Sequence, residues 1–289
     1  MVPEGASDLT LIWPWQDRNG RFSALKGLIF ATLFLPAIWI VYQVQTRQFG
    51  PFPLAGMTYW SGVWATAVLL MALAVTPAMT VFRWRHLVVV RRMIGVTALV
   101  YTIAHTIIYF ALRLWDFGLI ANEMVTRLTL IIATISLIGL IPLGMTSLDY
   151  AVRRMGAEGW ARLHNTVYVL TLLALVHYLL SPGVYSSQYL MSGMFFWLMV
   201  WRWLNNRGLG TDARALLVLA IATCLFTALL EAGWEWIYQD FEPDWVLGNN
   251  FSLEFGVSPA WWNLAAGLLI ALIAALRHTP HLSPQGKAG

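Results

Sequence analysis

Apolar residues dominate eight long stretches of this chain, and polar and charged residues gather in the segments between them. A helix needs about 20 residues to cross a hydrocarbon core of about 30 Å, and each stretch is close to that length. The pattern therefore predicts an all-α integral membrane protein with about eight transmembrane helices. The expected helices cover residues 24–44, 60–82, 92–113, 126–147, 163–181, 187–204, 214–236 and 259–277.

Three of the expected helices contain a proline, at Pro36, Pro77 and Pro142. In a membrane bundle, neighbouring helices and waters can bond the carbonyl groups that a proline leaves free. We therefore expect local kinks at these positions rather than interruptions of the spans.

The composition agrees with a membrane protein. Of the 289 residues, 59% are hydrophobic and 11% are charged, whereas about a quarter of the residues of a soluble domain are charged. The single cysteine, Cys224, excludes an intrachain disulfide and thiolate clusters, and we interpret it as a small apolar residue. The 16 tryptophans and ten tyrosines fit either rings at the membrane interfaces, the favoured interpretation, or the lining of a cofactor cavity.

Arginines concentrate in alternate connecting segments, which the positive-inside rule places in the cytoplasm together with both termini. The opposite face is different: its last segment, residues 237–258, contains four acidic residues and no lysine or arginine. In a Gram-negative bacterium that face is periplasmic, so we predict a multi-pass protein of the inner membrane. The basic residues counted here are Arg83, Arg85, Arg91, Arg92, Arg153, Arg154, Arg162, Arg202, Arg207, Arg214, Arg277 and Lys287.

The distribution of histidines suggests a division of the chain. The first six expected helices hold all the intramembrane histidines, and the last two hold none. We expect a cytoplasmic N-terminal segment at 1–23, a core at 24–206, two accessory helices with the acidic periplasmic segment at 207–277, and a cytoplasmic tail at 278–289.

Three histidines, His105, His164 and His177, lie inside the apolar stretches, where an imidazole is costly unless it binds something. At about 1.5 Å per residue, His105 and His177 lie roughly 20 Å from the cytoplasmic start of two parallel helices. Two imidazoles at one depth can ligate a haem iron axially, provided that the third and fifth expected helices touch, and such a hexacoordinate centre is suited to electron transfer.

His164 lies nearer the cytoplasm, at the depth of Arg91 on the third expected helix. A second bis-histidine haem is therefore not supported. His164 could bind a haem with a weaker partner, orient a flavin or contact a propionate.

Ordinary explanations remain for each of these histidines. An intramembrane histidine is often a helix–helix hydrogen bond. A proton relay would favour acidic partners at depth, where Glu231 is the only obvious carboxylate. We interpret His86, His278 and His281 as surface residues. Topology alone explains the arginines, although a basic rim would also hold haem propionates or a flavin phosphate.

Several motifs resemble the ferric-reductase-like transmembrane family, and within it the haem-binding membrane subunits of periplasmic methionine sulfoxide reductases. They are LAVTP at 73–77, RRMIGVTALVYTIAH at 91–105, IPLGMTSLDYAVRRMG at 141–156 and the pattern from Trp160 through His164 and His177 to Tyr178. The resemblance covers roughly residues 25–205. It departs from the family at Asn165, where a basic residue is usual, and in about 80 further residues after the sixth helix.

The resemblance implies six spans that carry haem b and flavin mononucleotide. It also implies a periplasmic molybdopterin-type reductase as acceptor, and a cytoplasmic flavin reductase or the quinone pool as donor. The family's histidines correspond to His105, His164 and His177, and its arginine pair to Arg91 and Arg92. Because the chain lacks a GxGxxG dinucleotide fingerprint, its electrons must come from another protein or a membrane carrier.

We therefore expect an electron-transfer subunit rather than a stand-alone catalyst, with the lipid bilayer but no nucleic acid as a partner. In the leading hypothesis, His105 and His177 ligate a far-side haem b, and His164 and Arg91 support a near-side centre. The segment at 237–258, with Trp245 and Phe251, is a candidate docking surface or an ordinary solvated loop. The alternatives are another cytochrome b of the same broad family with a different acceptor, or a non-redox assembly or transport protein.

Overall fold

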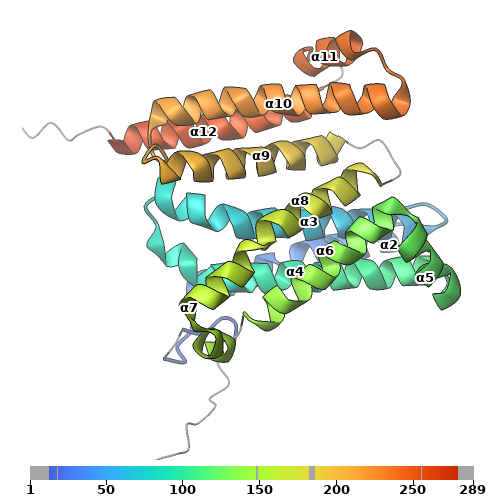
Figure 1. Ribbon diagram of the computed structural model, residues 1–289, viewed down its shortest axis with the longest axis horizontal. Coiled ribbons are helices and arrows are strands. Elements are labelled where there is room, and N and C mark those ends of the chain that lie inside the picture. Colours follow the sequence, from blue (N-terminus) through green and yellow to red (C-terminus); the bar gives the residue numbers. More distant parts are fainter. Residues whose placement is uncertain (1–12, 18, 148, 182–185, 255, 279–289) are drawn as a thin grey trace, which may run out of the picture.

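The computed structural model describes residues 13–17, 19–147, 149–181, 186–254 and 256–278, and helices form most of this part of the chain (Figure 1). The only strand-like feature within it is an isolated bridge between Gln16 and Phe22. The helices are α1 Ala24–Thr32, α2 Leu35–Gln45, α3 Pro53–Val81, the short 3₁₀ helix η1 Arg85–Leu87, α4 Val88–Leu112, α5 Phe117–Thr126, α6 Leu128–Met145, α7 Asp149–Asn165, α8 Val167–Leu179, α9 Ser186–Asn206, α10 Ala213–Gln239, α11 Pro243–Phe251 and α12 Pro259–His278.

Six helical segments of the described chain are long and apolar enough to cross a membrane, and together they make this an all-α, multi-pass membrane protein. They correspond to six of the eight expected helices. The other two expected helices are present as α8, which has 13 residues, and α9, which has 21. α8 follows α7 after a single residue, Thr166. The candidate spans are Ala24–Gln45, Pro53–Val81, Arg85–Leu112, Leu128–Met145, Ala213–Gln239 and Pro259–Arg277.

The first span is broken between α1 and α2, next to Pro36. A continuous helix would carry a bond from the Ala37 amide to the Leu33 carbonyl. Instead, the Tyr101 hydroxyl of α4 lies between these two groups: it donates to the Leu33 carbonyl at 2.8 Å and accepts from the Ala37 amide at 3.2 Å. The expected kink is present, and a side chain of another helix stabilises it.

Pro77 lies inside α3 and has no N–H to donate to the Leu73 carbonyl. Arg202 of α9 supplies the missing donor, because its Nη2 lies 2.7 Å from that carbonyl while its Nη1 donates to the Leu198 carbonyl at 2.8 Å. The guanidinium also lies over the Tyr168 ring. Arg202, which we counted as part of a basic loop, is therefore a half-buried bridge between helices.

α3 is the centre of the packing. It lies against α4, η1, α2, α8 and α9, while α6 lies against α8, α5 and α4. α9 lies between this group and the pair α10–α12, as Figure 1 shows. Two clusters of buried apolar side chains meet at α3: one extends toward α9, α10 and α12, and the other toward α4 and α6.

The two ends of the bundle carry different elements. In Figure 1, α5 and α11 lie at one end, and α7 lies at the other, where the chain also leaves α12. The arginines of the segments around η1 and α7 share this second end and are exposed. Gly156, at φ 73°, interrupts the helical backbone of α7 in a conformation that favours glycine.

Part of the predicted organisation lies outside the described residues. Residues 1–12, the side chain of His278, His281 and Lys287 all belong to that part. His86 is exposed, as we predicted for a surface histidine. Cys224 is buried beside Ala228 and Ala260, in agreement with its interpretation as a small apolar residue.

Candidate functional site

His105 projects from α4 toward α3. Its Nδ1 lies 2.9 Å from the Thr58 carbonyl oxygen and 3.1 Å from the Ser61 hydroxyl. A carbonyl oxygen can only accept, so Nδ1 carries the proton and donates. Nε2 is then left with a free lone pair, the form in which imidazole binds a metal.

His177 of α8 has the same arrangement with a different neighbour. Its Nδ1 lies 3.0 Å from the carbonyl oxygen of Thr129, at the start of α6. The same reasoning assigns the proton to Nδ1 and the lone pair to Nε2. Histidines that ligate metals usually donate their other ring N–H in this way, which fixes the tautomer and the orientation of the ring.

The rings of His105 and His177 lie together, with centroids 6.3 Å apart and planes inclined by 68°. A bond from imidazole nitrogen to a metal is about 2 Å long, so one metal bound by both Nε2 atoms would hold the centroids roughly 6 Å apart. The equal depth expected from residue counting is present. Close packing of their helices on each other is not what brings them together: α4 packs mainly on α3 and α8 mainly on α6.

Gly62 leaves space beside His105. A Cβ atom at this position would lie 3.0 Å from Cε1 of the imidazole and 3.3 Å from its Nδ1. A side chain larger than that of glycine would therefore press on the ring, which is held from α3 by Thr58 and Ser61 on neighbouring turns.

His164 does not join this pair. It lies on α7, where its Nε2 is 3.1 Å from the Thr146 hydroxyl and its ring stacks on Trp160 with centroids 3.9 Å apart. Arg91 and Arg92 lie close enough for their positive charges to act on it. The structure therefore separates the three histidines into a pair and a single residue.

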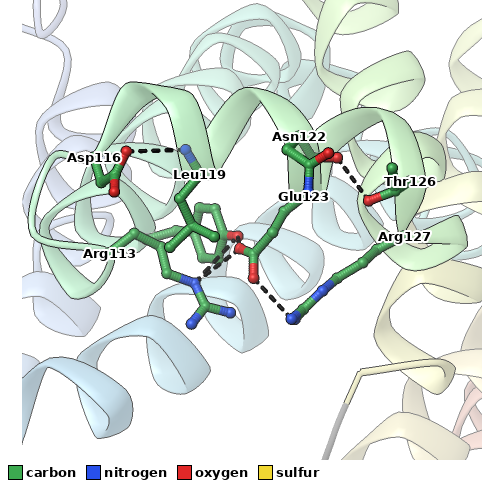
Figure 2. Close-up of polar contacts among 8 residues, drawn as sticks. Arg113, Asp116, Leu119, Asn122, Glu123, Thr126 and Arg127 are labelled. Atoms are coloured by element: carbon green, nitrogen blue, oxygen red, sulfur yellow. Dashed lines mark hydrogen bonds and ion pairs between the residues drawn. The ribbon is translucent and has the colours of Figure 1, made fainter.

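A buried ion cluster lies where α4, α5 and α6 meet, and the sequence analysis missed it (Figure 2). Glu123 is 3% exposed. Its Oε1 lies 2.8 Å from Arg127 Nη2, and its Oε2 lies 2.9 Å from Arg113 Nε. The Tyr109 hydroxyl also donates to Oε2. The sequence does contain a sign of this cluster: two arginines, Arg113 and Arg127, lie on the face where the positive-inside rule expects few basic residues.

Glu231 is not the only carboxylate at depth, which corrects the sequence interpretation. Glu235, one turn further along α10, is 5% exposed, and its Oε1 accepts a hydrogen bond of 2.5 Å from the Tyr189 hydroxyl. Asn250 of α11 donates to the Val246 carbonyl at 3.2 Å. Within the described residues, Oε2 of both glutamates and Oδ1 of Asn250 are buried and lack hydrogen-bond partners.

The acidic segment at 237–258 is more structured than the word loop implies, because α10 continues to Gln239 and α11 occupies Pro243–Phe251. Val246 and Asn250 of α11 are buried, whereas Trp245 and Phe251 are exposed.

The described residues contain no group of three or more His, Cys, Asp or Glu side chains placed to hold a metal ion.

Comparison with known proteins gives the family. The sequence model of the ferric reductase like transmembrane component matches residues 61–175, from α3 into α8. The haem-binding subunit MsrQ of the protein-methionine-sulfoxide reductase from Azospira oryzae is 31% identical over 166 residues, which cover 57% of this chain and 71% of that protein. MsrQ from Yersinia enterocolitica is 35% identical over 164 residues, 56% of this chain and 82% of that protein.

A third relative has another name. The magnetosome protein MamZ from Paramagnetospirillum magneticum is 28% identical over 208 residues, which cover 69% of this chain and 32% of that longer protein. No solved structure matches the chain.

Proposed function

The chain belongs to the ferric-reductase-like transmembrane family, within the group of MsrQ subunits, and on that premise we propose that it carries electrons across the membrane through haem b. In this proposal His105 and His177 are the axial ligands of a far-side haem. The observation that carries it is their ring separation of 6.3 Å, with both Nδ1 atoms committed to backbone carbonyls.

The residues present fit a haem on three counts. The separation suits one metal between two imidazoles, the tautomer leaves Nε2 available, and Gly62 leaves space beside one ring. Haem held by two histidines supplies one-electron chemistry without an open position on the iron. Helices of the protein hold the ligands, and the apolar bundle keeps water from the centre.

The carbonyls of Thr58 and Thr129 do more than hold the rings in place. By accepting hydrogen bonds from the Nδ1–H groups, they make the Nε2 lone pair of each imidazole a stronger metal ligand. They also stop the rings from turning. Ser61 adds a second contact to His105. This arrangement favours two fixed ligands and little rearrangement when an electron arrives.

We propose that the opposite end of the bundle holds a near-side centre. Its supporting residues are His164, stacked on Trp160, with Arg91 and Arg92 close enough to act on His164 electrostatically. Arginines at this end suit the phosphate of a flavin mononucleotide or a haem propionate. Haem and flavin quantitation per polypeptide tests which of the two is bound.

We propose an electron path from the cytoplasm to the periplasm of a bacterial inner membrane. A cytoplasmic flavin reductase or the quinone pool would be the donor, and a periplasmic molybdopterin-type methionine sulfoxide reductase the acceptor. Both termini would be cytoplasmic, with residues 24–206 as the haem-binding core and 207–277 as an accessory pair. The exposed Trp245 and Phe251 of the acidic segment would contribute to docking the acceptor.

The first experiment is a dithionite-reduced minus oxidised spectrum of the purified wild-type protein and three histidine variants. We expect a low-spin haem b signal in the wild type. His105→Ala and His177→Ala should each abolish it, because either change removes an axial ligand, whereas His164→Ala should retain a substantial part.

His86→Ala is the matched control, since His86 is exposed in η1 and should leave the spectrum unchanged. Size-exclusion chromatography of each variant separates ligand loss from misfolding. A wild-type protein without haem after haem-replete expression would refute the proposal. Equal loss in all three variants would refute the assignment of the pair.

The resemblance to MamZ favours a second candidate, a cytochrome of the same family with a different acceptor. Mixing the reduced protein with a methionine sulfoxide reductase catalytic subunit distinguishes the two. Rapid reoxidation that requires this subunit supports the first candidate. Reoxidation only by other acceptors supports the second.

A further inference from the structure

The Glu123 cluster lies beside the segments that hold the histidine pair. Tyr109 and Arg113 follow His105 by four and eight residues on α4 and at its end, which is about one and two helical turns. Arg127 precedes α6 and is two residues from Thr129, whose carbonyl accepts from His177. Members of the cluster therefore lie in the same backbone segments as His105 and as Thr129, the partner of His177.

Glu123 contacts both sides. Its Oε2 receives the Tyr109 hydroxyl and Arg113 from the side of His105, and its Oε1 receives Arg127 from the side of His177. Figure 2 shows the carboxylate between the two arginines. Its two oxygens thus join the end of α4, one to two turns beyond His105, to the start of α6.

The charges of the cluster do not cancel. Two arginines face one carboxylate, which leaves one net positive charge in a setting where Glu123 is almost fully buried. A bound haem iron loses one positive charge on reduction. A nearby positive charge therefore favours the reduced state and raises the reduction potential, and burial reduces the screening of this effect.

Resting on the function proposed above, we propose that Glu123 is a positioning residue for the His105–His177 pair, and that the net positive charge of its cluster with Arg113 and Arg127 raises the reduction potential of the far-side haem. Glu123 fixes the distance between the two supporting helices. It also sets how much of the arginine charge the haem experiences.

The test is the midpoint potential of the haem-loaded, full-length protein, measured by redox titration of its low-spin spectrum. Glu123→Gln removes a negative charge and should shift the midpoint upward. Arg127→Gln removes a positive charge and should shift the midpoint downward. This shift should be smaller than that of Glu123→Gln, because the Arg127 side chain is 58% exposed and its charge is partly screened. Arg127→Lys keeps the charge and should restore most of the wild-type value.

Opposite signs distinguish this role from a structural one, since a loosened bundle would shift both midpoints in one direction. Asp116→Asn is the matched control: it removes the same charge as Glu123→Gln from an exposed position on the same connection, and should leave the midpoint unchanged. If Glu123→Gln fails to fold, the comparison of Arg127→Gln with Arg127→Lys decides: a downward shift in the first that is absent from the second supports the charge effect, and equal shifts in both overturn it.

The outcomes separate the two proposals. A wild-type protein without haem overturns the proposed function and this inference with it. A haem-loaded wild type whose variants show unchanged midpoints, or shifts of one sign, overturns only the role of the Glu123 cluster.

Discussion

Two corners of the molecule contain buried glutamate carboxyl groups at the same end of the bundle, yet the partners of these carboxyl groups differ. At the α4–α5–α6 corner, Glu123 meets two arginines and a tyrosine hydroxyl. At the α9–α10–α11 corner, Glu235 meets a tyrosine hydroxyl, and neither Glu231 nor Glu235 has an ion-pair partner among the described residues. The two arginines of the first corner need a carboxylate as their counter-ion, whereas no described group of the second corner needs one.

The difference shows why buried charge alone is a poor guide to importance. Removing one member of a buried ion pair leaves its partner without compensation, whereas replacing a buried acid that has only neutral partners leaves no opposite charge behind. Two substitutions can break or sharpen this comparison, and a third, at Arg202, tests a charged side chain that bonds backbone carbonyls instead of an opposite charge.

Glu123→Gln should have the largest effect on stability. It leaves Arg113 and Arg127 facing a neutral amide, and we expect a loss of about 2–3 kcal/mol, below the value for fully buried pairs because both arginines are partly exposed. Thermal unfolding in detergent measures it. Glu158→Gln is the control, since its pair with Arg162 is exposed and its loss should leave the melting temperature unchanged.

Arg202→Met should have an intermediate effect. The methionine keeps the apolar stem of the side chain but leaves the Leu73 carbonyl, freed by Pro77, without a donor, at a cost of about 1–2 kcal/mol. Pro77→Ala in the same protein supplies an N–H for that carbonyl and should recover most of the loss, as a double-mutant cycle would show.

Arg207→Met is the matched control for Arg202. It removes an exposed arginine of the same region that lies over the Trp203 ring, and it should change the melting temperature little. An equal loss in Arg202→Met with and without Pro77→Ala would contradict the role assigned to this bond.

Glu235→Gln should have the smallest effect, within about 1 kcal/mol of the wild type and toward higher stability. The amide oxygen still accepts from Tyr189, and the amide N–H adds a donor next to acceptors that lack one. A loss as large as that of Glu123→Gln would show that a positive charge depends on Glu235, and the contrast between the two corners would fail.

Features that depend on distance along one helix could be predicted from the sequence. The rise per residue is constant, so counting from the basic segments placed His105 and His177 at one depth, and the structure has their rings 6.3 Å apart. Apolar length predicted the six spans for the same reason. The assignment of the two histidines as ligands stays a prediction.

Features that depend on which helices meet could not be predicted. Glu123, Tyr101 and Arg202 act through partners on other elements, and nothing in their local sequence names those partners. Helix α11 was missed because its nine residues, PDWVLGNNF, are too few to show a helical period in the sequence. Counting also could not reveal that residues of α3 and α6 bond the two imidazole rings.

The bond from Arg202 to Leu73 has a consequence for how the protein is made. α3 enters the membrane with an unbonded carbonyl at Leu73, and its donor lies 129 positions later in the chain. Until α9 has been synthesised and docked, α3 is a span with a polar defect in lipid, where such a group is costly. Because α3 is synthesised before α9, the Leu73 carbonyl of α3 gains its hydrogen bond only after α9 has docked. Thr58 and Ser61, which hold His105, belong to this same helix.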